Sequence, residues 1–217
     1  MDKEPFEEVN PEVNSSDESI NESIEQSEKV SSVSSPVVAG TFNWRKELLE
    51  WVEAIVIAVV LALIIRTFVF NLVKVDGNSM LPTLHHEDRL FVWKLGYVPR
   101  QGDIIIFRPK AHKDTPYVKR VIAVPGQTVD IDFKNHIVKV DGEVLDEDYI
   151  YEPTANPGNM EFPLTVEPNT VFVLGDNRNN SRDSRFKDVG LVSYDSIMGK
   201  AVFRIWPLKS FGLLNKK

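Results

Sequence analysis

A serine and a lysine of this sequence could together cleave an amide bond. Ser79 lies in VDGNSMLPTL, residues 75–84, and Lys119 lies in YVKRVIAV, residues 117–124. A lysine can take the proton of a serine hydroxyl only when its amine is neutral, and burial favours that state because desolvation disfavours the ammonium ion. If the second stretch is a strand, Lys119 shares a face with Tyr117, and that face must be buried for Lys119 to act as a base.

Both stretches also have ordinary explanations. Glycine and asparagine stand directly before Ser79, and they are common turn residues because they adopt positive φ at little cost. A lysine on an edge strand can keep its ammonium group in water through its long side chain. On the same strand, Arg120 is expected to point away from Lys119 and from the serine.

Other candidates for catalysis are weaker. His85 and His86 precede two acidic residues, but neighbours on an extended chain point to opposite faces, and the sequence has no cysteine to complete a metal site. The G-x-S-x-G elbow of serine hydrolases with a histidine base is absent. Ser184 and Lys187 fit the S-x-x-K pattern, yet neither S-D-N nor K-T-G follows. We therefore expect no metal and no cofactor.

A third stretch, LGDNRNNSRDSRF at residues 174–186, is strongly polar and follows an apolar run. An ordinary surface loop accounts for that composition. In a functional loop, Asp183 and Arg185 would form an ion pair that fixes the loop. The hydroxyl of Ser181 would then orient the lysine amine.

The N-terminal region differs in composition from the rest. Residues 1–43 hold ten acidic residues against two lysines, a net charge of −8, which leaves the remainder of the chain at +1. This acidic, serine-rich segment predicts a disordered tail, because it has too few apolar residues to offset the entropy of ordering. The nearly neutral remainder argues against a nucleic-acid-binding face, which would need clustered basic residues.

Residues 44–73 predict a membrane anchor helix. The uncharged core spans residues 54–65, and apolar flanks extend it to about twenty residues, the length of a transmembrane span. Glu53 and Arg66 lie near its ends, where long side chains can reach the interface. Two basic residues just before the span favour a cytoplasmic N-terminus, which places the region after residue 73 outside the cytoplasm. An amphipathic or buried helix is the alternative.

Residues 74–217 predict one mainly β domain. Short runs rich in β-branched and aromatic residues alternate with glycine and proline. The Asp-Gly pair in VKVDGEVL is a strong hairpin signal. The expected strands lie within residues 89–95, 103–109, 117–125, 128–133, 136–145, 170–176 and 197–207.

Taken in order behind an anchor, these stretches resemble the type I signal peptidases, membrane-bound bacterial enzymes that remove signal peptides from exported proteins. GNSMLPTL is similar to the nucleophile motif of that family, YVKRVIAVPG to its lysine motif, and GDNRNNSRDSRF to its third signature. The likeness covers about residues 45–207. It implies a compact antiparallel β catalytic domain behind one transmembrane helix, a serine endopeptidase without a cofactor, and preproteins and the lipid bilayer as partners.

The resemblance carries over residue by residue. Ser79 matches the nucleophile, Lys119 the general base, and Ser181 the hydroxyl that positions the lysine. Some members have a serine two residues before the nucleophile that donates to the oxyanion hole, but this chain has Gly77 there, so the hole relies on backbone N–H groups such as that of Ser79. Met80, which follows the nucleophile, is expected to be exposed and to face the membrane. The supporting residues of the polar loop are Asp176, Arg178, Asp183 and Arg185.

Two other classes of protein share parts of this pattern. Self-cleaving repressors of the SOS type also use a serine–lysine dyad on a β-rich domain, but they are soluble and bind DNA. A membrane-anchored β domain that binds a partner would leave Ser79 and Lys119 without a chemical role. Loss of processing in a Ser79→Ala variant distinguishes an enzyme from such a binding domain.

Overall fold

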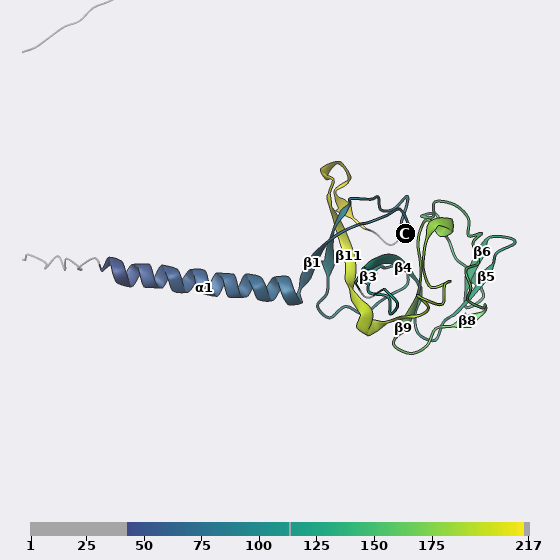
Figure 1. Ribbon diagram of the computed structural model, residues 1–217, viewed down its shortest axis with the longest axis horizontal. Coiled ribbons are helices and arrows are strands. Elements are labelled where there is room, and N and C mark those ends of the chain that lie inside the picture. Colours follow the sequence, from purple (N-terminus) through teal and green to yellow (C-terminus); the bar gives the residue numbers. More distant parts are fainter. Residues whose placement is uncertain (1–42, 113, 215–217) are drawn as a thin grey trace, which may run out of the picture. The chain divides into compact units, whose positions relative to one another are not determined.

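A computed structural model describes residues 43–112 and 114–214 of the 217-residue chain (Figure 1). The acidic tail expected over residues 1–43 lies, except for its last residue, outside the described part. The described residues form one long helix followed by a mainly β region with antiparallel sheets. This is the fold class predicted from the sequence.

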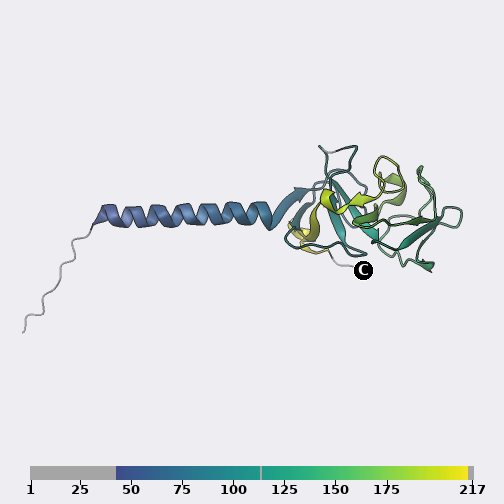
Figure 2. The ribbon, with the colours of Figure 1, turned by 90° about the horizontal axis from the view of Figure 1, so that it is seen from below.

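The long helix is α1 (Trp44–Phe68). Glu47 lies in its first turn and Arg66 in its last, an arrangement that suits the helix dipole. At 1.5 Å per residue, 25 residues give a length of about 37 Å, which exceeds the thickness of a bilayer's hydrocarbon core. The mean hydropathy of its apolar window is 2.6. By length and composition, α1 can cross a membrane; Figure 2 shows it as one continuous helix.

The helix ends earlier than the sequence pattern predicts. The anchor was expected to continue to residue 73, whereas α1 ends at Phe68 and strand β1 (Phe70–Lys74) follows almost at once. β1 pairs along its whole length with β2 (Arg89–Trp93). Hydropathy alone does not mark the end of the helix, because residues 68–73, after Arg66 and Thr67, are again mostly apolar.

The larger sheet has eight strands, and its neighbouring strands are antiparallel. Both candidate catalytic residues belong to this part of the fold: Ser79 lies in the loop after β1, and Lys119 lies in strand β4. The order is β1, β2, β11, β3, β4, β9, β10, with β12 paired to β11. The remaining bounds are β3 (Ile104–Phe107), β4 (Tyr117–Ala123), β9 (Thr170–Leu174), β10 (Val192–Ser193), β11 (Ile197–Trp206) and β12 (Gly212–Leu213).

The smaller sheet is a four-stranded antiparallel unit, labelled in part in Figure 1. Its order is β7 (Glu143–Val144), β6 (Ile137–Val140), β5 (Thr128–Asp132), β8 (Leu164–Thr165). The predicted Asp-Gly hairpin joins β6 to β7, with φ of 53° at Asp141 and 84° at Gly142. Three short 3-10 helices complete the fold: η1 (Arg178–Asn180), η2 (Tyr194–Ser196) and η3 (Leu208–Ser210).

Strand β4 lies where three hydrophobic clusters meet. Val118 belongs to one cluster, Val121 to a second and Ile122 to a third. Because these clusters cover both faces of the strand, every residue of β4 after Tyr117 is buried. A polar side chain on β4 is therefore withdrawn from water whichever face it points to.

Candidate active site

Ser79 lies in the loop that connects β1 to β2. The ends of this loop are held by backbone hydrogen bonds from Val75 to Asp88 (2.8 Å) and from Glu87 to Val75 (3.0 Å). The side chain of Leu84 is buried in the core beneath it. Ser79 itself is half-buried at a cavity of about 470 Å³, where a substrate can reach its hydroxyl.

Gly77 gives the backbone its tight turn just before the serine. Its φ is 89°, a conformation that residues with a Cβ rarely adopt. Its N–H donates to Nδ1 of His86 at 3.2 Å, so this histidine contacts the turn. Among the described residues, no group of three or more histidine, cysteine or acidic side chains is placed to hold a metal ion.

Lys119 reaches the serine from β4. Its Nζ makes hydrogen bonds to Ser79 Oγ at 2.7 Å and to the carbonyl oxygen of Val118 at 2.9 Å. It also lies 5.3 Å from the centre of the Tyr117 ring, so the shared strand face predicted from the sequence is present. The two residues are 40 positions apart in the chain and are brought together by the packing of the β1–β2 loop onto β4.

Burial sets the protonation of this amine. Lys119 is only 4% exposed, and desolvation lowers its pKa from 10.5 to about 8. The negative charges of Asp183 and Asp176 raise the pKa and so oppose part of that effect, while Arg185 lowers it. A substantial share of Lys119 is therefore neutral at mildly alkaline pH, as a base requires.

The polar loop that follows β9 is fixed to β4 by a buried ion pair. Arg120 donates from Nε to Asp176 Oδ1 (2.9 Å) and from Nη2 to Asp176 Oδ2 (2.7 Å). The hydroxyl of Thr83, which lies in the loop of Ser79, also donates to Asp176 Oδ2 (2.5 Å). Asp176 thus joins three segments: the serine loop, β4 and the polar loop.

Arg120 does not have the uninvolved role expected from the sequence. It points away from Lys119, but it is 1% exposed and its guanidinium also lies 4.0 Å from the centre of the Tyr149 ring. Alternation along a strand distinguishes the two faces but does not say which face meets water. The sequence did not reveal the buried ion pair of Arg120, because alternation along β4 does not show that both faces of the strand are covered.

Asp183 and Arg185 form the second buried pair of the loop. Arg185 donates from Nε to Asp183 Oδ1 and from Nη2 to Asp183 Oδ2, both at 2.9 Å. Asp183 Oδ2 also accepts the backbone N–H of Gly175 at 3.0 Å. Asp183 thereby ties the middle of the loop to its first residues. The sequence predicts the ion pair between Asp183 and Arg185, and the structure contains it.

Arg178 links the loop to the segment before β8. Its Nε donates to the carbonyl oxygen of Gly175 (3.0 Å), and its Nη1 donates to Thr154 Oγ1 (2.9 Å) and faces Glu147 Oε1 (2.5 Å). Burial raises the pKa of Glu147, while the charge and hydrogen bond of Arg178 act in the opposite direction. Arg178 therefore contacts the polar loop and its support rather than Ser79.

Ser181 and Met80 differ from expectation in their contacts. Ser181 Oγ is buried and makes no hydrogen bond within the described residues, so the structure does not join it to Lys119. It lies beside Gly175, whose added Cβ would come 2.2 Å from Ser181 Oγ and 2.5 Å from the carbonyl oxygen of Ser79. Met80 is 1% exposed and packs in the core, so the expectation that it faces the membrane was wrong.

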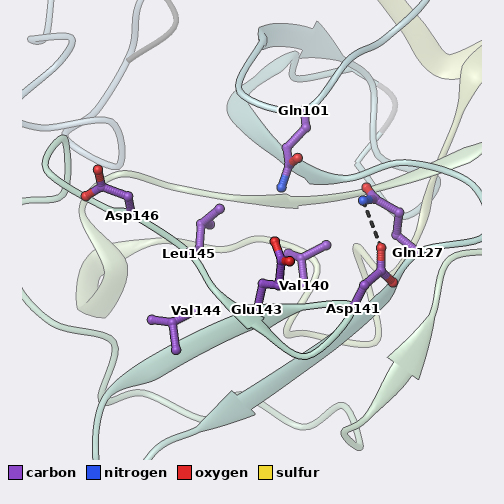
Figure 3. A pocket seen from close by; sticks show the side chains of 8 residues that line it. All are labelled: Gln101, Gln127, Val140, Asp141, Glu143, Val144, Leu145 and Asp146. Atoms are coloured by element: carbon purple, nitrogen blue, oxygen red, sulfur yellow. Dashed lines mark hydrogen bonds between the residues drawn. The ribbon is translucent and has the colours of Figure 1, made fainter.

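A second hollow, drawn in Figure 3, lies apart from these residues. It has a volume of about 370 Å³ and shares no lining residue with the cavity at Ser79. Within it, Gln127 Nε2 donates to Asp141 Oδ2 at 3.1 Å. Its lining residues are Gln101, Gln127, Val140, Asp141, Glu143, Val144, Leu145 and Asp146. It holds no pair comparable to Ser79 and Lys119.

A serine hydroxyl bonded to a buried amine of lowered pKa can perform the chemistry of a serine hydrolase whose base is a lysine. Comparison with known proteins agrees with that class. Residues 48–206 match the family model described as "Signal peptidase, peptidase S26". The chain belongs to this family, and it is a peptidase.

The chain is similar over most of its length to named members of the family. It is 43% identical over 177 residues to signal peptidase I of Leptolyngbya laminosa, covering 77% of this chain and 84% of that protein. It is 40% identical over 182 residues to signal peptidase I S of Bacillus subtilis (strain 168), covering 79% and 96%. A crystal structure of a signal peptidase I from Enterococcus faecalis V583 is 32% identical with a TM-score of 0.40, covering 48% of this chain and 97% of that chain.

Proposed function

We propose that this membrane signal peptidase cleaves signal peptides from exported preproteins with Ser79 as nucleophile and Lys119 as general base. The observation that carries the proposal is the 2.7 Å hydrogen bond between Lys119 Nζ and Ser79 Oγ, made by an amine whose pKa burial lowers to about 8. The remaining features of the site explain how that pair is held.

The reaction proceeds in two stages. Neutral Lys119 takes the proton of Ser79 Oγ while the oxygen attacks the scissile carbonyl carbon, and the resulting tetrahedral intermediate carries the charge on the former carbonyl oxygen. As the C–N bond breaks, protonated Lys119 gives its proton to the leaving amine. Lys119 then takes a proton from a water molecule as the water oxygen attacks the ester carbon on Ser79. As the ester C–O bond breaks, Lys119 gives that proton to Ser79 Oγ, and the signal peptide leaves with a free carboxyl group.

Backbone N–H groups stabilise the oxyanion. Gly77 has no side-chain donor, so the N–H of Ser79 with a neighbouring group serves this purpose; loss of one such donor typically costs about 3 kcal/mol of transition-state stabilisation. Met80 contributes through its place in the core beneath the nucleophile. We assign to Ser181 the orientation of the lysine amine during the reaction; its buried hydroxyl, which makes no hydrogen bond within the described residues, leaves it available for that contact.

The four supporting residues of the polar loop act through structure. Asp176 is bound to Arg120, and Asp183 is bound to Arg185, in bidentate ion pairs with both partners buried. An arginine does not lose its proton at neutral pH and cannot act as a base. Arg178 supports the loop through Gly175 and Glu147.

We also propose a membrane arrangement, which α1 and its flanks support. We place the acidic tail, residues 1–43, in the cytoplasm and the β domain outside it, with α1 as the single anchor between them. Support comes from the length and hydropathy of α1 and from Arg45 and Lys46 before its apolar core, since basic residues favour the cytoplasmic side. Signal-peptide-bearing preproteins then reach Ser79 at the extracytoplasmic surface of the membrane that α1 crosses.

A processing assay tests the proposed function. The full-length protein in detergent is incubated with a preprotein, and the product is identified by N-terminal sequencing. We expect cleavage at one site at the end of the signal peptide, and none with Ser79→Ala. Cleavage by a folded Ser79→Ala variant would overturn the assignment of the nucleophile.

A further inference from the structure

Asn177 holds the nucleophile loop, which is the connection between β1 and β2 at residues 75–88 that carries Ser79, through two hydrogen bonds. Its side-chain Nδ2 donates to the carbonyl oxygen of Asn78, and its backbone N–H donates to the carbonyl oxygen of Ser79, both at 3.0 Å. Asn177 is 5% exposed and lies 99 positions from Asn78 along the chain. One residue of the polar loop therefore binds the two consecutive peptide groups on either side of Ser79.

The bond to the Asn78 carbonyl also fixes the direction of the Ser79 N–H. Both atoms belong to the peptide group that joins these residues, which is trans. In a trans peptide group, C=O and N–H lie in one plane and point in opposite directions, so holding the oxygen holds the hydrogen. A donor stabilises charge in a transition state most when it is aimed before the reaction begins.

This aim matters particularly because of Gly77. Glycine brings no side-chain donor to the oxyanion, and its φ of 89° shows that the backbone here uses the freedom that a missing Cβ allows. The Asn78 carbonyl accepts one other backbone hydrogen bond, from the N–H of Leu81 at 3.2 Å. Asn177 Nδ2 supplies the shorter of the two.

The chain on both sides of Asn177 is held by hydrogen bonds. The preceding residue, Asp176, is held by the guanidinium of Arg120 and the hydroxyl of Thr83. The carbonyl oxygen of Asn177 accepts the N–H of Asn180 at 3.1 Å, which closes the short helix η1. The residue that binds the nucleophile loop therefore directly follows a residue of a buried ion pair.

We propose that Asn177 is a positioning residue that aims the Ser79 N–H at the scissile carbonyl oxygen, on which negative charge develops. The inference rests on the proposed role of Ser79 as nucleophile. It assigns to Asn177 a contribution to the transition state that differs from the holding of the loop by Asp176 and Asp183.

The test compares two asparagines of the same loop. Asn177→Ala removes Nδ2 and keeps the backbone N–H. Asn179→Ala is the matched control, because Asn179 Oδ1 accepts the N–H groups of Ala155 and Asn156 while its Nδ2 donates to Pro153. In the full-length enzyme, we expect Asn177→Ala to lower kcat by about 10- to 100-fold with KM nearly unchanged. Asn179→Ala should keep kcat within about two-fold.

A peptide aldehyde distinguishes aiming of the donor from general loosening of the loop. Ser79 Oγ adds to the aldehyde carbon and forms a tetrahedral adduct whose oxygen occupies the oxyanion position, whereas the corresponding peptide alcohol forms no adduct. In Asn177→Ala, the affinity for the aldehyde should fall by the same factor as kcat/KM, and the affinity for the alcohol should not change. The pH midpoint of kcat should also stay in place. An unchanged kcat, equal losses for aldehyde and alcohol, or a shifted midpoint would each overturn the inference.

A second variant covers the case that Asn177→Ala does not fold. Asn177→Asp keeps the shape of the side chain, but the ionised carboxylate cannot donate to the Asn78 carbonyl, so kcat at neutral pH should fall as in the alanine variant. An undiminished kcat in folded Asn177→Asp overturns the inference. Ser79→Ala, measured alongside, separates the two levels: if it remains active, the proposed function fails as well, whereas if it is inactive and both Asn177 variants keep full kcat, only the role of Asn177 fails.

Discussion

At the scale of the residue, the Lys119 amine lies between the hydroxyl of Ser79, the carbonyl of Val118 and the ring of Tyr117. A lysine in water, with a pKa near 10.4, is neutral to only about 0.04% at pH 7. With the pKa lowered to about 8 by burial, the neutral fraction at the same pH rises to about one tenth. Desolvation alone therefore raises the neutral fraction of the Lys119 amine; no second basic side chain is needed to remove its proton.

The first prediction is that cleavage rises with pH through about 8 and depends on a lysine at position 119. Arginine keeps the charge but does not deprotonate, so Lys119→Arg should be as inactive as Ser79→Ala while still folding. Lys139→Arg, the same exchange on strand β6, is the control and should keep its activity. Preprotein cleavage is measured from pH 5 to 10, with circular dichroism as a check of folding. Substantial activity in folded Lys119→Arg would rule out this mechanism.

The second prediction concerns stability, because a buried base destabilises the fold below its pKa. In the folded state the pKa is about 8, and the ordinary value is 10.5. Between these values the unfolded chain binds a proton that the folded chain does not, so the free energy of unfolding rises with pH there. Below pH 8 the cost is present in full, about 3 kcal/mol from the difference between the two pKa values.

Lys119→Met removes this cost and keeps a side chain of similar length. At pH 7 it should raise the melting temperature, and its advantage over the unmodified protein should shrink as the pH approaches 10.5. Lys139→Met should show no comparable dependence on pH. Thermal unfolding at several pH values measures both. A melting temperature that falls at pH 7 would contradict the assigned burial cost.

At the scale of the element, the sequence predicts β4 and the polar loop well and predicts their connection poorly. The strand face that Lys119 shares with Tyr117 follows from local alternation, and so does the pairing of Asp183 with Arg185, which lie two positions apart. The contact of Arg120 with Asp176 spans 56 positions. No local pattern identifies such a partner. An arginine on a strand and an aspartate in a polar run are as compatible with exposure to solvent as with a buried ion pair.

The third prediction is that Asp183 supports the site structurally and also sets its pH response. Asp183→Asn leaves Arg185 buried without its counter-ion, which typically costs 3 to 5 kcal/mol, so the melting temperature should fall clearly. Because the charge of Asp183 raises the pKa of Lys119, its removal should also move the midpoint of the pH–activity profile to lower pH. An activity lost completely, with melting temperature and midpoint unchanged, would contradict a structural role.

The fourth prediction tests the close approach at Gly175, the junction of β9 with the polar loop. A Cβ there would come 2.2 Å from Ser181 Oγ and 2.5 Å from the Ser79 carbonyl oxygen, so Gly175→Ala requires a shift that is expected to reach the nucleophile loop. Displacement by about 1 Å typically lowers a rate by about 100-fold. Gly212→Ala, whose Cβ would have no neighbour within 4 Å, is the control. The measurement is kcat for preprotein cleavage in both variants. Normal turnover in Gly175→Ala would contradict the prediction, because it would show that the added Cβ leaves Ser79 in place.

At the scale of the whole molecule, composition separates the acidic segment, the apolar helix and the β-rich region, but it does not place the residue at which the helix ends. The excess of acidic residues before residue 44 and the apolar run after it are unambiguous in the sequence. The end of the helix was placed wrongly because the apolar character of the helix continues through most of residues 68–73, and only the pairing of Phe70–Lys74 with β2 shows that this stretch is a strand. The pairing of β1 with β2 therefore sets the boundary between the helix and the β region.

The last prediction concerns the acidic tail. In the proposed topology, residues 1–40 lie on the side of the membrane opposite Ser79, and few of their side chains are apolar enough to pack against a folded domain. Their deletion keeps Arg45 and Lys46, the basic residues that favour a cytoplasmic N-terminus. The orientation of α1 and the reach of Ser79 to the membrane surface should therefore persist.

Cleavage of a preprotein by the variant without residues 1–40 should remain within a few-fold of that by the intact enzyme, in membranes and in detergent. Ser79→Ala provides the baseline of no activity, and protease treatment of intact cells or spheroplasts reports on which side the β domain lies. If the deletion lowered cleavage in membranes close to that baseline while detergent restored it, the tail would be needed for orientation. If activity were lost in detergent as well, the tail would contact the catalytic domain, and the proposed topology would be wrong.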